Sequence, residues 1–301
     1  MYNAITNYEN TFYLNGMALS GITNVDGSYN IDYKPVNVMG KGFVKQVINS
    51  IPTAQLSINR YLVNNDPVFS LTGDGDNYTA QYCNGGLYYK GKYFSFDQGY
   101  LNSFSISCSV GEVPQIDSQF NIYGNIGPVS DPTGNINAGS VFVPQVKNIN
   151  LTCRNSTTNR IKDFSIDFNC PKTPIYGLAS SNAQFPLEVH NVFPIEVTTS
   201  FTLEIDNYET KELFDDLSSS PITNFNISVS GTILENIPLQ TYDGLTLTTY
   251  DDIELDAFTK VQKTTPIFNF SNSNAIILSE QINSSADDLM SVTLSYKTYL
   301  N

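Results

Sequence analysis

The chain has one histidine, His190, which lies in an alternating stretch of polar and apolar residues at 188–192. A Ser-His-Asp triad could be built only around this imidazole, and a metal centre with several histidine ligands is excluded. A histidine in such a stretch is usually structural or exposed at the surface. We therefore expect no catalytic role for His190.

Carboxylates offer two further kinds of chemistry. Asp74, Asp76 and Asn77 resemble the start of a calcium-binding loop, but Tyr78 stands where a further oxygen ligand is needed and the twelfth position is not a glutamate. The acidic runs at 215–216 and 251–256 could supply the carboxylate pair of a glycosidase, yet nothing in the sequence brings two of them together. The sequence thus predicts no enzyme, no metal and no cofactor.

Four cysteines, Cys83, Cys108, Cys153 and Cys170, are widely spaced and form no Cys-x-x-Cys pair, so neither a zinc knuckle nor a redox motif is available. The N-terminal residues lack the basic and apolar regions of a secretory signal, which predicts synthesis in a reducing cytoplasm. The cysteines are therefore expected to be small buried apolar residues rather than disulfide partners.

The composition narrows the class of protein. Apolar residues make up 41% of the 301 residues and charged residues 15%, which is typical of a globular chain. The 15 Lys and Arg residues stand against 29 Asp and Glu, giving a formal net charge of −14. Binding to nucleic acid phosphates needs clustered Lys and Arg, and an apolar run long enough to span a bilayer is missing. We expect neither a nucleic-acid-binding surface nor a membrane partner.

Strand-like alternation dominates the elements that would position any site. Apolar and polar residues alternate in eight segments, which are separated by Gly, Pro, Asn and Asp. These segments are 29–33, 54–58, 104–110, 120–123, 164–168, 201–205, 225–229 and 292–296. Only 209–217 and 284–289 have the spacing or capping residues of short helices. The sequence predicts an all-β fold with at most one or two short helices in each half.

The two halves of the chain resemble each other. Segments 29–33, 54–61 and 120–123 match 164–168, 201–208 and 292–296 in the same order. The anchors of this alignment are Ile31, Asp32, Tyr33, Pro35 and Gly40 in the first copy, and Ile166, Asp167, Phe168, Pro171 and Gly177 in the second. Chance matching of alternating strands is the alternative explanation. The alignment predicts two similar β-barrel or β-sandwich domains in tandem, at residues 1–148 and 149–301.

Three further stretches point to a family. Residues 21–29, then Ile58-Asn59-Arg60 before Asp66-Pro67, then residues 99–111 leading to Val113-Pro114-Gln115 resemble the tail tube, or major tail, proteins of tailed bacteriophages in their duplicated form. The resemblance covers most of the chain. It implies a small β-barrel or sandwich in each domain, with rings whose inner sheets join into one continuous channel.

The resemblance also implies a function and partners. Such a protein is a structural component of the virion, assembled in the host cytoplasm, and its stacked rings form a tube for DNA passage. Three two-domain chains would replace six single-domain ones, with other copies and other tail proteins as partners and no specific binding of the passing DNA. Loops at 36–43 and 176–181 would lie between rings. The alternatives are a receptor- or carbohydrate-binding β-sandwich protein of the tail tip and, third, a glycan-degrading enzyme.

Overall fold

The computed structural model describes residues 10–30, 33–35, 39–40, 47–49, 53–63, 66–72, 78–134, 149–153, 156–158, 160–177, 185–204, 222–238, 258–284 and 290–300. Within these ranges the chain is built from β-strands and one short 3-10 helix, so the all-β prediction is confirmed. The predicted helix at 209–217 lies outside the described residues, as do 285–289 of the second predicted helix.

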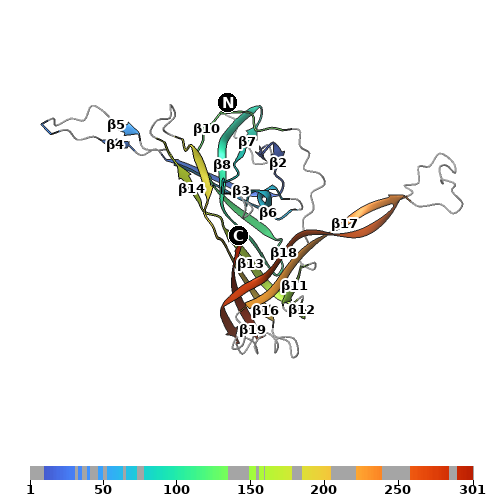
Figure 1. Ribbon diagram of the computed structural model, residues 1–301. Helices are drawn as coiled ribbons and strands as arrows, with labels where there is room; N and C mark the ends of the chain where they lie inside the picture. Colours follow the sequence, from blue (N-terminus) through green and yellow to red (C-terminus); the bar gives the residue numbers. More distant parts are fainter. Residues whose placement is uncertain are drawn as a thin grey trace, which may run out of the picture.

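Strands of the first half come in the following order (Figure 1): β1 (Asn10–Leu14), β2 (Met17–Ala18), β3 (Ile22–Asn30), β4 (Tyr33–Pro35), β5 (Val47–Asn49), β6 (Thr53–Tyr61), the 3-10 helix η2 (Pro67–Leu71), β7 (Cys83–Tyr89), β8 (Lys92–Ser109), β9 (Gln115–Ile122) and β10 (Ile126–Gly127). The second half continues with β11 (Ile149–Cys153), β12 (Ser156–Thr158), β13 (Ile161–Asn169), β14 (Lys172–Ile175), β15 (Glu188–Asn191), β16 (Ile195–Glu204), β17 (Ile222–Pro238), β18 (Phe258–Asn283) and β19 (Ser291–Leu300).

Fifteen of these strands form one antiparallel sheet. Its main path runs β3-β6-β9-β8-β13-β16-β19-β18-β17-β11-β12, and β7, β1 and β2 continue from the N-terminal part of β8. The pairs β4–β5 and β14–β15 are separate two-stranded hairpins. In Figure 1, β17 and β18 extend from the body as a long two-stranded arm, and β4–β5 projects away from it on the other side.

The alternation of the sequence decides which face of the sheet is buried. Along β16 the side chains alternate strictly between buried and half-buried, with Val197, Phe201 and Leu203 inside. Successive side chains of a strand point to opposite faces, so each apolar residue of the pattern enters the core and each polar neighbour faces outward. All eight segments predicted to be strands overlap strands of the structure.

One hydrophobic core extends through both halves of the chain. Phe104 of β8 stacks on Phe168 of β13 with ring centroids 4.2 Å apart and planes 9° from parallel. Phe168 contacts Phe270 edge-on at 5.4 Å, and Phe270 packs near Phe225 at 5.9 Å. Aromatic rings bury large apolar areas, so this chain of contacts is a major source of stability. It crosses the predicted domain boundary without a break.

The same pairing scheme occurs twice. In the first half the order is β3-β6-β9-β8-β7-β1-β2, and in the second it is β13-β16-β19-β18-β17-β11-β12. Each three-stranded unit, β3-β6-β9 and β13-β16-β19, carries a two-stranded hairpin, β4–β5 or β14–β15, between its first and second strands. The halves thus share strand order, direction and partners.

β-bulges fix the residue-by-residue correspondence of the halves. The register shifts between Ile22 and Asn24 in β3 and between Ile161 and Asp163 in β13. It also shifts between Leu101 and Ser103 in β8 and between Ile277 and Ser279 in β18. Because a bulge inserts one residue at a defined place, matching bulges identify equivalent positions. Asn24 therefore corresponds to Asp163, and Ser103 to Ser279.

This correspondence differs from the sequence alignment by four residues. The alignment matched Tyr29 with Phe164, whereas the bulges match Tyr29 with Phe168 and Gly27 with Ile166. Side chains alternate with a period of two, so a slip of four residues keeps every residue on its face and leaves the apolar pattern intact. Alternation alone gave no means of detecting the slip.

The alignment anchors accordingly lie at different kinds of position. Ile166 and Phe168 are buried in the core and Asp167 lies on the opposite face of the sheet. Pro171 and Gly177 flank β14, Tyr33 and Pro35 belong to β4, and Gly40 lies in a turn with φ of +86°, while Ile31 and Asp32 are outside the described residues. The division at residue 148 remains a prediction, because sheet and core continue across it.

Candidate functional site: the polar face and two strand edges

The side of the sheet opposite the core is lined by short polar and acidic side chains from both halves. We call it the polar face. None of its residues is fully buried, since each is half-buried or exposed. It comprises Asp26, Ser57, Ser105, Ser107, Asp117, Gln119, Asp163, Ser165, Asp167, Glu196, Thr198, Ser200, Thr202, Thr293, Ser295 and Lys297.

Negative charge prevails on the polar face. Five of its residues are carboxylates, and its one cation, Lys297, forms an ion pair of 2.6 Å with Glu196. Asp117 and Asp167 both stand opposite Ser105, one on each neighbouring strand. Burial raises the pKa of both carboxyls, and for Asp167 a hydrogen bond from Ser165 partly offsets the effect. Carboxylates therefore outnumber cations among the residues of the polar face.

Serines form a row across five strands of this face. Ser165 pairs with Ser107 on one side and Ser200 on the other, and Ser200 is followed by Ser295 and Ser279. Serine has a small side chain, so the side chains project little from the sheet along this row. This part of the polar face thus carries hydroxyl groups on short side chains.

β3 forms one edge of the sheet. Within the described part of the chain it pairs with β6 only, which leaves its other edge open along residues 22–29. Its side chains are largely exposed, including Tyr29 at 49%. A long, open edge strand offers unpaired N–H and C=O groups to another strand, and proteins normally block such edges.

The C-terminal part of β18 forms a second open edge. β18 pairs with β17 up to Ile276 and with β19 from Ile276 to Asn283. Beyond Ile276 the described residues provide no strand on the β17 side. Ile282 is 51% exposed here, although the equivalent residue of the first half, Ile106, is fully buried.

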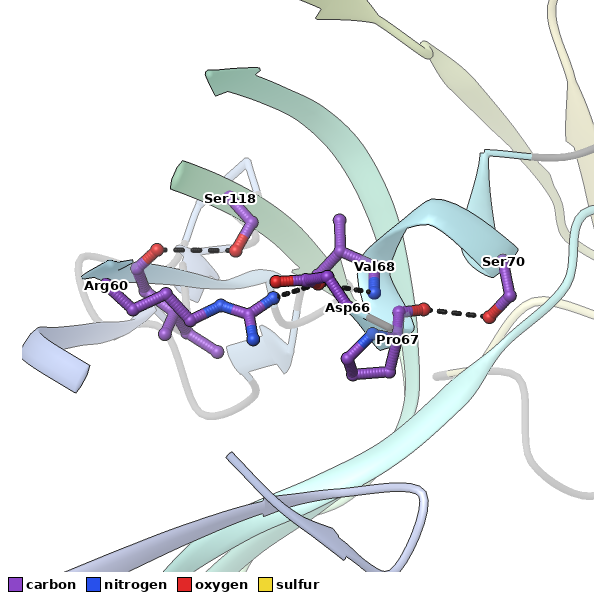
Figure 2. Close-up of polar contacts among 7 residues, drawn as sticks. Arg60, Asp66, Pro67, Val68, Ser70 and Ser118 are labelled. Carbon is purple, nitrogen blue, oxygen red and sulfur yellow. Dashed lines mark hydrogen bonds and ion pairs between the residues drawn. The ribbon is translucent and has the colours of Figure 1, made fainter. Parts of the chain in front are cut away.

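A buried ion pair supports the neighbouring strand β6. Arg60 of β6 contacts the Asp66 carboxylate, and both side chains are fully buried (Figure 2). The Val68 amide donates to Oδ1 of Asp66 at 2.9 Å, so Asp66 also caps η2. Burial raises the pKa of the Asp66 carboxyl, and the Arg60 charge opposes that rise. Ser118 Oγ donates to the Ile58 carbonyl at 3.3 Å, which ties β9 to β6.

Those residues considered for chemistry that the structure describes, His190 and three of the cysteines, are not brought together. His190 is partly exposed in β15 and lies 3.0 Å from Glu188, its neighbour on the same strand. Cys83, Cys108 and Cys170 are free and buried as predicted, and burial raises the pKa of the Cys83 thiol to about 12. Residues 73–77 and the acidic runs at 215–216 and 251–256 lie outside the described residues.

Within the described ranges, His, Cys, Asp and Glu side chains form no group of three that could hold a metal ion. No helix among those residues has the length and apolar character needed to cross a bilayer. Comparison with known proteins finds no matching family model and no significant match among curated proteins.

The two open edges were not predicted from the sequence. Among the described side chains of β18, Ile276, Leu278 and Ile282 are the large apolar ones that are exposed. They are visible in the sequence, but their meaning depends on which strand edge is unpaired. Backbone groups form that edge, and every residue except proline supplies the same ones. The sequence of 258–283 lacks a regular alternation, so it carried no signal of this edge.

Proposed function

We propose that this chain is a structural virion protein whose copies form stacked rings, and that these rings make the tail tube through which a bacteriophage delivers DNA. In this proposal it catalyses no reaction and needs no cofactor. Its partners are other copies of itself, other tail proteins and the passing DNA. The protein resides in the virion tail after assembly in the host cytoplasm. The two open strand edges carry the proposal.

The contact between β8 and β13 serves as a template for contact between copies. These strands pair from Asp163↔Ser109 to Asn169↔Ser103 and join the first half to the second. β3 is the equivalent of β13, and β18 is the equivalent of β8. Each copy thus carries both partners of one more such contact, one at each open edge.

The template predicts the register between copies. Ser28 is the equivalent of Asp167, and Gln281 is the equivalent of Ser105. The pair Asp167↔Ser105 within the chain therefore predicts that Ser28 of one copy lies opposite Gln281 of the next. Ile282 then takes the place of Ile106 and loses its exposure to water. Fully burying an isoleucine side chain contributes about 1.5–3 kcal/mol, which adds to the new backbone hydrogen bonds.

Repeating one head-to-tail contact generates a closed ring or an open filament. We propose a ring of three chains with six copies of the pairing scheme, as the family resemblance implies. The polar face would run unbroken around the inside of this ring, because Ser28 and Gln281 extend it across the joint. Its carboxylates would keep DNA phosphates from adhering to the wall.

Native mass spectrometry and negative-stain microscopy of the full chain test the proposal. Rings of three chains, and tubes at higher concentration, are expected. The variant Ser28→Cys with Gln281→Cys should form disulfide-linked species of up to three chains, since directly opposite residues approach disulfide distance. Tyr61→Cys with Gln281→Cys is the matched control, because Tyr61 is exposed but lies on β6, inside the edge.

Two results would contradict parts of this scheme. A chain that stays monomeric at every concentration refutes the tube function. Rings that form without the Ser28–Gln281 cross-link, or that cross-link equally in the control, refute the β18–β3 joint.

A hollow on the polar face favours a second candidate function. It has a volume of about 290 Å³ and is lined mainly by amide and hydroxyl side chains of β3, β6, β8 and β9, including Gln55, Asn102 and Asn121. Such groups can bind sugar hydroxyls, which supports a receptor- or carbohydrate-binding protein of the tail tip. Glycan-array binding by a discrete monomer, lost in Asn121→Ala, would favour this function over the tube.

A further inference from the structure

A lysine of the β14–β15 hairpin is buried without a counter-ion. Lys172 of β14 is only 9% exposed, and none of the ion pairs among the described residues includes it. Proteins rarely bury an unpaired lysine, because an isolated ammonium group is costly to remove from water. The environment of Lys172 therefore calls for a physical explanation.

The carboxamide of Asn191 lies directly against this amine. Lys172 and Asn191 stand opposite each other in the antiparallel pair β14–β15, so their side chains leave the same face of the hairpin. Lys172 Nζ donates a hydrogen bond of 2.6 Å to Asn191 Oδ1, and Asn191 is itself only 7% exposed. Oδ1 is bonded to Cγ, the carbon atom at which a carboxamide exchanges its nitrogen. The amine is thus placed next to an electrophilic carbon.

Burial also favours the nucleophilic form of Lys172. Removal from water lowers the pKa of its ammonium group, and the neighbouring Cys170 opposes this effect only in part. Burial raises the pKa of the Cys170 thiol to about 11, so the thiol stays neutral and gives Lys172 no counter-charge. An unprotonated amine has the free electron pair that a nucleophile needs, and desolvated lysines act as nucleophiles in proteins for this reason.

Backbone hydrogen bonds hold the two residues in this arrangement. The Asn191 amide donates to the Tyr78 carbonyl at 2.7 Å. At the next position the Val192 amide donates to the Pro171 carbonyl at 3.0 Å. Two groups that are fixed in contact react far faster than the same groups free in solution, because the entropy of bringing them together has already been lost.

We propose that Lys172 and Asn191 form an intramolecular isopeptide bond once the chain has folded. Nζ attacks Cγ, the Nζ–Cγ bond forms and the Cγ–Nδ2 bond breaks. Nδ2 leaves as ammonia after taking one proton from Nζ, so no oxidant, cofactor or other reactant is consumed. The product is an uncharged secondary amide, which is less costly to bury than an ammonium group.

The bond would lock the β14–β15 hairpin beside the contact between the two halves. Val189 of β15 is buried in a small cluster with Ala80 and Tyr100, next to the β8–β13 pairing. Lys172↔Asn191 is the pair at the open end of the hairpin, where its strands lead to β13 and β16. A cross-link that closes a loop reduces the entropy of the unfolded chain, so the hairpin should open less easily.

Mass spectrometry of the unmodified full chain tests the bond. After denaturation, trypsin would cleave an unreacted chain behind Lys172 and yield the peptides 163–172 and 173–211. Acylation of Nζ blocks this cleavage. The expected product is therefore a single peptide 163–211 whose mass is lower than its sequence requires by one ammonia, with the cross-link located between Lys172 and Asn191 by fragmentation.

Lys297 is a matched control within the same digest. Its Nζ also lies 2.6 Å from a side-chain oxygen, that of Glu196, but both side chains are partly exposed and form an ion pair. Trypsin should cleave behind Lys297 as usual. The variant Lys172→Arg should show no loss of ammonia and normal cleavage behind residue 172, since the charged guanidinium group is not a nucleophile.

The bond and the tube function can fail separately. Cleavage behind Lys172, or a peptide 163–211 at its full sequence mass, refutes the bond whether or not rings form. A loss of ammonia that persists in Lys172→Arg also refutes it, because the loss then arises elsewhere in the chain. A cross-linked chain that stays monomeric refutes the tube function and leaves the bond standing.

Discussion

Arg60 shows how a single residue can differ between two otherwise equivalent positions. Its counterpart in the second half is Leu203, since Ile22 pairs with Arg60 and Ile161 with Leu203. Both residues are buried, but Arg60 requires Asp66 beside it. A buried ion pair adds little net stability compared with apolar residues, although loss of one partner leaves a buried charge.

We expect Arg60→Leu to lower the free energy of unfolding by about 3–5 kcal/mol, because Asp66 is then buried without its counter-charge. Adding Asp66→Asn should restore a large part of the loss, since the amide carries no charge and its oxygen can still cap η2. Urea unfolding of the monomer measures both variants. Equal stability of the single and double variants would show that the charge of Asp66 is not the cause.

Asp117 gives a pH-dependent prediction. Burial raises the pKa of its carboxyl above the ordinary value of 3.8, so the charged form is disfavoured in the folded state. Asp117→Asn should therefore raise the melting temperature near neutral pH. The gain should shrink as the pH falls through the raised pKa, and it should vanish below about 3.8, where both folded and unfolded chains are protonated.

Asp131 serves as the control of opposite sign. Hydrogen bonds from the Thr133 amide and hydroxyl lower the pKa of its carboxyl. Asp131→Asn should lower the melting temperature at neutral pH, with the difference lost on acidification through that lowered pKa. Thermal melts across the acid range compare the two variants, and a gain from Asp131→Asn would contradict this account.

At the scale of elements, equivalent strands of the two halves differ in length and in which of their edges are paired. β7 and β8 are joined by a tight turn between Tyr89 and Lys92, whereas β17 and β18 extend past the equivalent residues, Val229 and Phe268, as a long arm. β8 has strands on both edges of its C-terminal part, but β18 has β19 alone there among the described strands. An unpaired row of backbone N–H and C=O groups, rather than a particular side chain, thus distinguishes β18 from β8.

Ile282→Lys should prevent ring formation without unfolding the chain. The side chain is exposed in the single copy, so the substitution should change monomer stability by less than about 0.5 kcal/mol. In the β18–β3 joint the lysine charge would have to be buried, which is costly. Analytical ultracentrifugation should find a monomer where the unmodified chain assembles.

Leu187→Lys is the matched control for this variant, since Leu187 is 60% exposed and precedes β15, outside the joint. It should assemble like the unmodified chain. If Ile282→Lys assembles at the same concentrations as the unmodified chain, the C-terminal edge of β18 does not take part in the contact between copies.

At the scale of the whole molecule, the continuous sheet sets the shape and charge of the proposed channel wall. Carboxylates from both halves lie on the polar face because β8 and β13 pair in a register that keeps polar rows aligned, as in Asp117, Ser105 and Asp167. The formal net charge of −14 has the same sign. The carboxylates of both halves are together expected to repel anions from the wall.

Replacing Asp117, Asp163 and Asp167 by lysine should make assembled rings retain DNA. Each Asp→Lys substitution raises the charge by two, so the net charge of the chain rises by six. The wall would then attract DNA phosphates. Because binding releases counterions, the affinity should fall steeply as the salt concentration rises. Filter binding of double-stranded DNA at several salt concentrations measures this. Replacement of the same residues by asparagine is the control and should leave DNA unbound, while salt-independent retention by the lysine variant would contradict the electrostatic explanation.

The sequence by itself determined the all-β class, the inward and outward faces of strands such as β13 and β16, and the burial of Cys83, Cys108 and Cys170. Burial follows from the apolar character of each side chain and from a period of two, both of which are local. The tertiary structure alone decided the register between the halves and the identity of the open edges. A slip of four residues changes neither period nor face, and strand edges consist of backbone groups that all sequences share, so only the pairing of distant strands could fix them.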